Sequence, residues 1–263
     1  MGTLSSSQKK ILIPLPHYGF DPTEAAIPWK AMKEAGYSCV FASPDGHIAQ
    51  ADRRMLTGED LGLFKSALMA KRDAVEVYRE LEKSAEFLAP LPYHKIESQT
   101  FDAVFLPGGH DKGMREYLES KALQTFIAKM FASDSTVGAI CHGTLLVARS
   151  RAEATGKSVL WGRRTTGLTK RQELFAYQLT RLYLGDYYLT YPDITLEDEV
   201  KGQLQRPEDF LCGPGFPIPL ARDSSQQLQH GFTVLDGKYL SARWPGDAHR
   251  FAAEFVRLLR QET

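Results

Sequence analysis

The segment Ala139-Ile140-Cys141-His142-Gly143 combines the residue types that nucleophilic catalysis needs. A short apolar run, residues 136–140, precedes Cys141, and an apolar stretch with helical spacing follows it over residues 144–150. A cysteine on such a strand-to-helix turn lies at the amino end of the helix, where free N–H groups and the helix dipole favour thiolate over thiol. We therefore expect Cys141 to be a reactive thiolate beside His142, on the kind of elbow that presents the serine of α/β-hydrolases. The residues alone also allow Cys141 to be a small buried hydrophobic residue.

A second segment, Pro107-Gly108-Gly109-His110, follows another apolar run, residues 101–106. Paired glycines at the end of a strand let backbone N–H groups approach a ligand closely, and such groups stabilise a developing oxyanion. Because this segment comes one strand–helix unit before Cys141, we expect Gly108, Gly109 and His110 to face the same substrate. The alternative is an ordinary turn that ends a strand.

The remaining histidines and cysteines give weaker signals. His110, His17 and His249 each lie in a loop near the end of a strand and could line one pocket, although loop histidines are more often solvated. Cys39 is expected in the core, and Cys212 is expected to be a loop thiol without a catalytic role. Three unpaired cysteines without a CxxC spacing favour a reducing compartment, the cytoplasm, and indicate neither a disulfide framework nor a zinc site.

The elements that must position these residues follow from the alternation of apolar runs and helical stretches. Asp21 before Pro22 is a good N-cap for a helix over residues 23–35, which Gly36 ends. Strands are expected at residues 11–15, 38–42, 101–106 and 136–140, with a hairpin or strand pair at 156–166 and two more strands within 231–241. Further helices are expected at residues 114–132, 170–182 and 248–260.

This order predicts an α/β protein with a flavodoxin-like, mostly parallel sheet sandwiched by helices. Residues 47–95 contain a long, charged, helix-prone stretch, and we expect a helical insertion there because no linker brackets it. Residues 185–230 are rich in glycine, proline and aspartate and are expected to form a looser C-terminal cap on the surface. The whole chain, residues 1–263, is therefore expected to be a single domain.

Composition argues against several classes of function. Lys+Arg and Asp+Glu number 32 each, so no net field favours nucleic acid or an anionic membrane. No apolar run approaches the ~18 residues that a membrane span needs. The polar residues 1–10 lack the apolar core of a signal peptide.

Taken together, the motifs resemble those of the ThiJ/PfpI superfamily, which shares the class I glutamine amidotransferase-like fold. The residues that carry the resemblance span about residues 10–260 and are listed here in chain order: Asp21-Pro22-Thr23-Glu24, Pro44-Asp45-Gly46, Pro107-Gly108-Gly109-His110, Ala139-Ile140-Cys141-His142-Gly143 and Ser241-Ala242-Arg243-Trp244-Pro245-Gly246-Asp247. Within the superfamily the chain looks most like the heat-inducible chaperone and glyoxalase III branch.

The resemblance implies a role for each matching residue. It implies Cys141 as nucleophile, His142 as its adjacent histidine, and Glu24 as the acid that hydrogen-bonds the cysteine sulfur. It places the acidic triad partner at Glu173, and the oxyanion donors at the N–H groups of Gly109 and His142. From the residues alone, Glu24 could instead be an exposed acid in a first helical turn, and Glu173 a solvated helix residue.

The resemblance also implies an activity. We expect a cysteine-dependent enzyme for small reactive carbonyls, either a glutathione-independent glyoxalase III that converts methylglyoxal to lactate or a deglycase, with no metal or organic cofactor. Two alternatives stay open: a stress-response chaperone or redox sensor with an oxidisable Cys141, and another small-molecule hydrolase or hydratase of the same fold. The expected partners are a small carbonyl substrate and a second copy in a homodimer, without nucleic acid or membrane.

Overall fold

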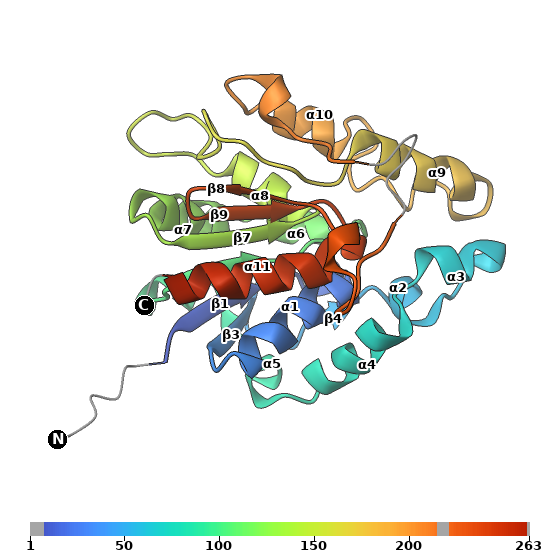
Figure 1. Cartoon of the computed structure of the whole chain (residues 1–263), viewed down its shortest axis with the longest axis horizontal. Coiled ribbons are helices and arrows are strands. Elements are labelled where there is room, and N and C mark those ends of the chain that lie inside the picture. The colour runs from blue at the N-terminus through green and yellow to red at the C-terminus, as the bar shows by residue number, and fades with distance from the viewer. Residues whose placement is uncertain (1–7, 215–220, 262–263) are drawn as a thin grey trace.

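The computed structural model describes residues 8–214 and 221–261 and is built around one seven-stranded sheet (Figure 1). The strands lie in the order β5-β3-β1-β6-β7-β9-β8, and every neighbouring pair is parallel except β8 and β9. The strands of this sheet are β1 (Lys10–Pro14), β3 (Ser38–Ser43), β5 (Leu91–Pro92), β6 (Ala103–Leu106), β7 (Thr136–Ile140), β8 (Thr233–Asp236) and β9 (Tyr239–Ala242). Two short strands, β2 (Tyr18–Phe20) and β4 (Gln50–Ala51), pair separately beyond the end of β1.

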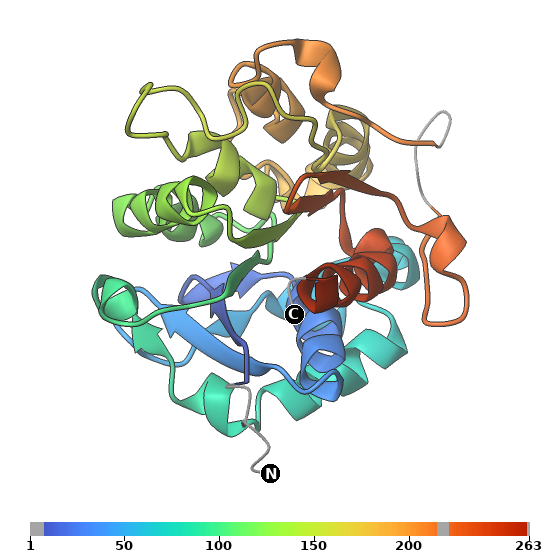
Figure 2. The ribbon, with the colours of Figure 1, turned by 60° about the vertical axis from the view of Figure 1, so that its left-hand side comes forward.

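Helices cover both faces of the sheet (Figure 2). Helices α1 (Pro22–Glu34) and α11 (Ala248–Gln261) pack together on one face, while α7 (Lys121–Ala132) and α8 (Gly143–Arg149) lie on the other. The remaining helices are α2 (Arg53–Thr57), α3 (Lys65–Leu68), α4 (Arg72–Leu81), α5 (Ala85–Leu88), α6 (Met114–Leu118), α9 (Lys170–Leu184) and α10 (Leu196–Lys201). The expected α/β fold, a mostly parallel sheet between helices, is confirmed.

The first helix forms as its sequence predicts. The Asp21 carboxylate accepts hydrogen bonds from the N–H groups of Thr23 and Glu24, and Pro22 occupies the first helical position. Gly36, with a φ of 87°, follows the helix in the left-handed conformation that glycine adopts without strain.

The region where a helical insertion is expected contains several short helices. Helices α2, α3, α4 and α5 fall within residues 53–88, with a 3₁₀ turn before α3. Helix α4 packs on α1, while α3 extends away from the sheet toward the end where the parallel strands finish (Figure 1).

The described part of the C-terminal half contains fewer strands than the sequence predicts. The strand pair expected over residues 156–166 is wrong, because that segment is made of turns and takes part only in isolated bridges, Arg151 to Ser158 and Thr165 to Phe210. The cap expected over residues 185–230 contains helix α10 and coil, and its residues 215–220 lie outside the described part of the chain, as do residues 1–7 of the polar N-terminus. Within the described residues, no helix is both long and apolar enough to span a bilayer.

Candidate active site

Cys141 sits on a strained turn at the carboxyl end of β7. Its φ of 54° lies in the left-handed region that residues other than glycine rarely occupy, which is the geometry of a nucleophile elbow. Its N–H donates to the carbonyl of Ala242 on β9, and its carbonyl accepts from the Thr144 hydroxyl in the first turn of α8. These bonds hold the strained backbone on both sides, and Cys141 lines a cavity.

Small residues make this turn possible. A side chain on Gly143 would place its Cβ 2.1 Å from the carbonyl oxygen of Leu106, and one on Gly138 would place its Cβ 2.6 Å from the ring of Phe255. In the parallel register Leu106 lies opposite Ala139, so the Gly-Gly segment after β6 runs directly beside the elbow. The two motifs singled out from the sequence are therefore neighbours.

Glu24 is fully buried beneath the elbow. Its Oε2 accepts a 2.9 Å hydrogen bond from the Gly108 N–H, and the carbonyl of Gly108 accepts from the Asp21 N–H at 2.8 Å. Its Oε1 makes no hydrogen bond of ordinary length to a described residue, but the carboxyl group interacts with the Cys141 thiol, an interaction that lowers the pKa of Glu24 and raises that of Cys141. Burial, and then the charge of Asp21, raise the pKa of Glu24 well above its usual value, which favours the protonated carboxyl. The exposed first-turn acid considered for Glu24 is ruled out.

The Cys141 sulfur is held as a thiol rather than as the expected thiolate. Burial raises its pKa well above the usual value, and negative charge on Glu24 or Asp21 acts in the same direction. The backbone N–H of His142 lowers the pKa of Cys141, but this effect is smaller. Desolvation therefore outweighs the amino end of α8, which is only seven residues long.

His142 can accept the proton that the thiol must lose. Its Nδ1 lies 3.5 Å from the Cys141 sulfur in a hydrogen bond. Burial lowers the pKa of His142 to about 3, so the ring is neutral at pH 7 and one of its nitrogens carries a free lone pair. The geometry therefore places a proton acceptor beside Cys141, while the lowered pKa makes His142 a weak base.

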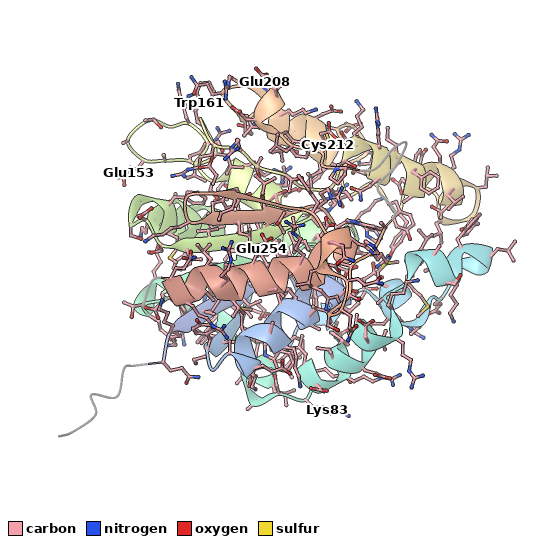
Figure 3. The ribbon with its side chains drawn as sticks, in the orientation of Figure 1. Lys83, Glu153, Trp161, Glu208, Cys212 and Glu254 are labelled. Carbon is pink, nitrogen blue, oxygen red and sulfur yellow. The ribbon has the colours of Figure 1, made fainter. Side chains whose placement is uncertain are left out.

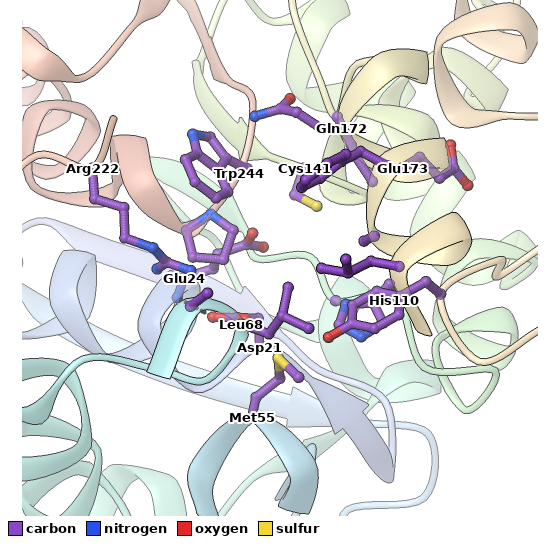
Figure 4. Close-up of a pocket in the computed structure, with 18 of the residues that line it drawn as sticks. Asp21, Glu24, Met55, Leu68, His110, Cys141, Gln172, Glu173, Arg222 and Trp244 are labelled. Atoms are coloured by element: carbon purple, nitrogen blue, oxygen red, sulfur yellow. Dashed lines mark hydrogen bonds between the residues drawn. The ribbon is translucent and has the colours of Figure 1, made fainter. Parts of the chain in front are cut away.

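Glu173 lines the same cavity but does not contact His142 (Figure 4). Its Oε2 accepts a 2.9 Å hydrogen bond from the Leu196 N–H at the start of α10, and its carboxyl group points away from Cys141. No hydrogen bond or ion pair joins Glu173 to His142 in the described part of the chain, so the expected contact that would fix the tautomer is not formed. The solvated alternative does not hold either, because Glu173 is buried and its pKa is raised by burial to about 7.

The second glycine of the Gly-Gly pair has the geometry of an oxyanion donor. Gly109 has a φ of 151°, and a Cβ there would meet the carbonyl oxygen of Gly19 at 2.5 Å, so only glycine fits. The Gly109 N–H donates to no described residue, and Gly109 lines the cavity beside Cys141. The Gly108 N–H instead donates to Glu24 Oε2, so Gly108 positions the Glu24 carboxyl group.

The profile of the family described as ThiJ/PfpI family-like matches residues 15–214, about three quarters of the chain. The chain belongs to the ThiJ/PfpI family. A relative from Schizosaccharomyces pombe, an uncharacterized protein, is 31% identical over 45% of this chain and 44% of its own length. The match to this relative therefore covers less than half of its length.

Other ThiJ/PfpI relatives have named activities. A glutathione-independent glyoxalase of the same yeast is 28% identical over 65% of this chain and 71% of its own length. A deglycase of Pyrococcus horikoshii is 24% identical over 92% of this chain and 94% of its own length. Among solved structures, glyoxalase III from Candida albicans superposes with a TM-score of 0.64 at 20% identity, covering 95% of this chain and 97% of that one, which shows the shared fold.

His110 lies in the cavity of this ThiJ/PfpI protein between two tyrosine rings. It stacks on Tyr188 at 4.4 Å between ring centroids and meets the edge of Tyr187 at 4.8 Å. Its Nε2 has no hydrogen-bond partner among the described residues, and burial lowers the pKa of His110 to about 4. His110 is therefore a neutral ring that shapes the wall of the cavity.

The other histidines considered lie outside the cavity. His249 contacts Asp73 at 3.1 Å, and His17 contacts Asp45 at 2.7 Å and Glu116. His17, Asp45 and His47 bring three donor atoms within 4.8 Å of one another, a proximity that the sequence spacing did not indicate. Because Asp45 is hydrogen-bonded to both imidazoles, these contacts account for the cluster without an ion.

The three cysteines differ in their surroundings. Cys39 is buried in the core as expected, and Cys212 is an exposed thiol on the surface (Figure 3). Only Cys141 lies both in the sheet's elbow and in the wall of the cavity.

Sequence reasoning missed several residues that line the cavity. Asp21 was assigned only as a helix cap, and Trp244 was seen only as part of a motif, whereas both line the cavity beside Arg222. Arg222 lies in coil and carries no local pattern that could have marked it. Trp244 follows Arg243, whose buried ion pair with Asp247 at 2.8 Å fixes the turn after β9, so the motif did contain a usable signal.

Proposed function

We propose that this protein is a cysteine-dependent enzyme for small reactive carbonyls, either a glutathione-independent glyoxalase or a deglycase. The observation that carries the proposal is the strained elbow at Cys141, which lines a cavity together with Glu24 and has the neutral His142 ring within hydrogen-bond distance of its sulfur. The names of the relatives, glyoxalase and deglycase, support the same class of substrate.

The geometry suggests an order of steps for methylglyoxal. His142 Nδ1 accepts the thiol proton as the Cys141 sulfur adds to the aldehyde carbon, and the N–H groups of Gly109 and His142 stabilise the alkoxide oxygen until it is protonated. The former aldehyde carbon then loses its hydrogen as a proton, giving an enediol. A proton returns to the neighbouring carbon, giving a lactate thioester that water hydrolyses to lactate and the free thiol.

Glu24 is the group best placed to move the proton between the two carbons. Its Oε2 is fixed by the Gly108 N–H, and its carboxyl group interacts with the Cys141 sulfur. The aldehyde carbon is oxidised and the ketone carbon reduced within one molecule, so the balance needs water and no redox cofactor. Deglycation of an adduct would use the same sulfur, acid and oxyanion donors.

The redox-sensor alternative receives less support from the structure. A sensor cysteine needs an accessible thiolate, whereas burial raises the pKa of Cys141. A chaperone role and assembly as a homodimer stay predictions.

The decisive experiment compares lactate formation from methylglyoxal by the wild-type protein, Cys141→Ala and Cys212→Ala. We expect Cys141→Ala to lose turnover and Cys212→Ala to keep it, because only the first thiol faces the cavity. Equal rates in all three proteins would remove Cys141 from catalysis. Absence of lactate together with protection of a heat-unfolded client would support the chaperone role instead.

A further inference from the structure

The cavity in front of Cys141 is far larger than a three-carbon aldehyde. Its volume is about 610 Å³, which falls within the range of pockets that enclose drug-sized ligands. Methylglyoxal would occupy only the part next to the sulfur. Most of the cavity volume would therefore stay unfilled by methylglyoxal.

Two segments outside the sheet form apolar walls on either side of this space. Met55, Phe64 and Leu68 come from the helical insertion, while Phe175, Ala176 and Leu179 come from α9. At the side of the sheet where the parallel strands end, α9 lies above and α2 and α3 lie below in the view of Figure 1. Such walls favour a ligand with an extended apolar body, since burying apolar surface contributes about 25 cal/mol per Å².

One cation in the cavity wall, Arg222, has no hydrogen-bonded or ion-paired partner among the described residues. Its guanidinium lies 4.7 Å from the Trp244 ring. Burial lowers the pKa of Arg222, with Asp21 opposing that effect, yet a guanidinium stays protonated in proteins. None of its five N–H donors has an acceptor among residues 8–214 and 221–261, and unpaired donors are costly in a partly desolvated place.

Three acids, Asp21, Asp223 and Glu24, act on the charge of Arg222, but none forms a hydrogen bond or ion pair with it among the described residues. The Asp223 Oδ2 accepts a 2.7 Å hydrogen bond from the Arg250 N–H. Asp21 uses its carboxylate to cap α1, accepting from the N–H groups of Thr23 and Glu24. The raised pKa of Glu24 favours its protonated form, and Glu24 is held by Gly108. The other cation in the wall, Lys71, is exposed and already donates to the carbonyl of Ser66 at 2.9 Å.

We propose that the substrate of this site is a carbonyl compound with an extended apolar body and a carboxylate group, and that Arg222 binds the carboxylate. This inference rests on the proposed function for the carbonyl end, while the apolar and anionic ends rest on the cavity alone. A carboxylate matches the planar fork of a guanidinium and would accept two of its unused donors. Arg222 is thus a specificity residue on the wall that also contains Cys141 (Figure 4).

The test uses two unreactive probes of equal shape, 4-phenylbutanoate and 4-phenylbutanamide, with calorimetric binding to the wild-type protein, Arg222→Gln, Arg222→Lys and Lys71→Gln. We expect the wild-type protein to bind the carboxylate at least tenfold more tightly than the amide. Arg222→Gln should abolish this preference, and Arg222→Lys should keep part of it because the charge remains. Lys71→Gln removes the other cation of the same wall and should leave the preference for the carboxylate unchanged.

Equal binding of the two probes to the wild-type protein, or failure of both to bind, would overturn the proposal. So would loss of the preference in Lys71→Gln with its retention in Arg222→Gln. Repeating the titration with Cys141→Ala separates this inference from the proposed function. That variant should still prefer the carboxylate through Arg222 even if the wild-type protein never converts methylglyoxal to lactate.

Discussion

At the scale of single residues, two effects change the pKa of Cys141 in opposite directions. The elbow and the N–H of His142 favour a thiolate, whereas burial disfavours any charge at the sulfur, and burial is the larger effect. Elbow geometry could be predicted from five consecutive residues. The protonation state could not, because it depends on Glu24 and Asp21, which pack against the sulfur from more than a hundred positions earlier in the chain.

Glu24→Gln tests whether the buried acid moves a proton. The amide oxygen can still accept from the Gly108 N–H, and the amide nitrogen takes the place of Oε1, so we expect an unchanged fold. An amide cannot donate a proton and then take it back, so kcat/KM for methylglyoxal should fall by about 10²–10⁴. The measurement is lactate formation beside a melting curve, with Glu34→Gln, an exposed acid of the same helix, as control. Full activity in Glu24→Gln would show that the Glu24 carboxyl group transfers no proton in the reaction and has only a structural role.

At the scale of elements, the ends of three neighbouring strands assemble the site. β6 supplies the Gly-Gly segment, β7 supplies the elbow, and β9 accepts the Cys141 N–H and leads into Trp244. The register of β6 against β7 sets Gly108 so close to the elbow that a Cβ would lie 2.6 Å from the His142 nitrogen and 2.7 Å from Glu24 Oε2.

Gly108→Ala should therefore damage stability and activity together. The added methyl group must push the elbow or Glu24 aside, and we expect a loss of roughly 1–3 kcal/mol in the free energy of unfolding. We also expect at least a tenfold fall in kcat/KM. Gly202→Ala is the control, because its Cβ would lie 3.3 Å from its closest neighbour, a carbonyl of α10. If Gly108→Ala matched the control in urea unfolding and in turnover, the close fit inferred at the elbow would be wrong.

Sequence patterns were most informative for these elements. The strand at residues 136–140 and the capped first helix were predicted closely, because their signals are local. Local patterns did not predict the turns at residues 156–166 or the hydrogen-bond partner of Glu173. Both depend on how distant parts of the chain pack together. Glu173 comes 31 residues after His142, yet the orientation of α9 directs its carboxyl group to α10.

At the scale of the whole molecule, the cap above the sheet is joined by reciprocal bonds between two helix starts. Glu173 of α9 accepts a hydrogen bond from the Leu196 N–H of α10, while the Lys170 N–H of α9 donates a 2.8 Å hydrogen bond to the Glu197 carboxylate of α10. Burial raises the pKa of Glu173 to about 7, so the folded chain keeps a proton there that the unfolded chain releases near pH 4.5. The stabilisation from this neutral carboxyl is complete below pH 4.5 and is lost as the pH rises through about 7.

Glu173→Gln should remove that pH dependence. The amide oxygen can still accept from the Leu196 N–H, and the amide has no proton to lose. The free energy of unfolding of the variant, relative to that of the wild-type protein, should therefore rise by roughly 1–3 kcal/mol from pH 5 to pH 8. Urea unfolding at both pH values measures the gain, and Glu208→Gln, an exposed acid, should show none. Lactate formation should stay within about threefold of wild type, whereas a hundredfold loss would restore Glu173 as a partner of His142.

The apolar walls of the cavity come from the insertion and from α9, while the sulfur, its acid and its oxyanion donors come from the sheet and α1. Chemistry and recognition are thereby encoded by separate stretches of sequence. Exchanging residues 61–69 or 172–179 between homologous proteins should retarget the enzyme to different compounds without rebuilding its reactive centre, which makes these two stretches the natural place to begin engineering it.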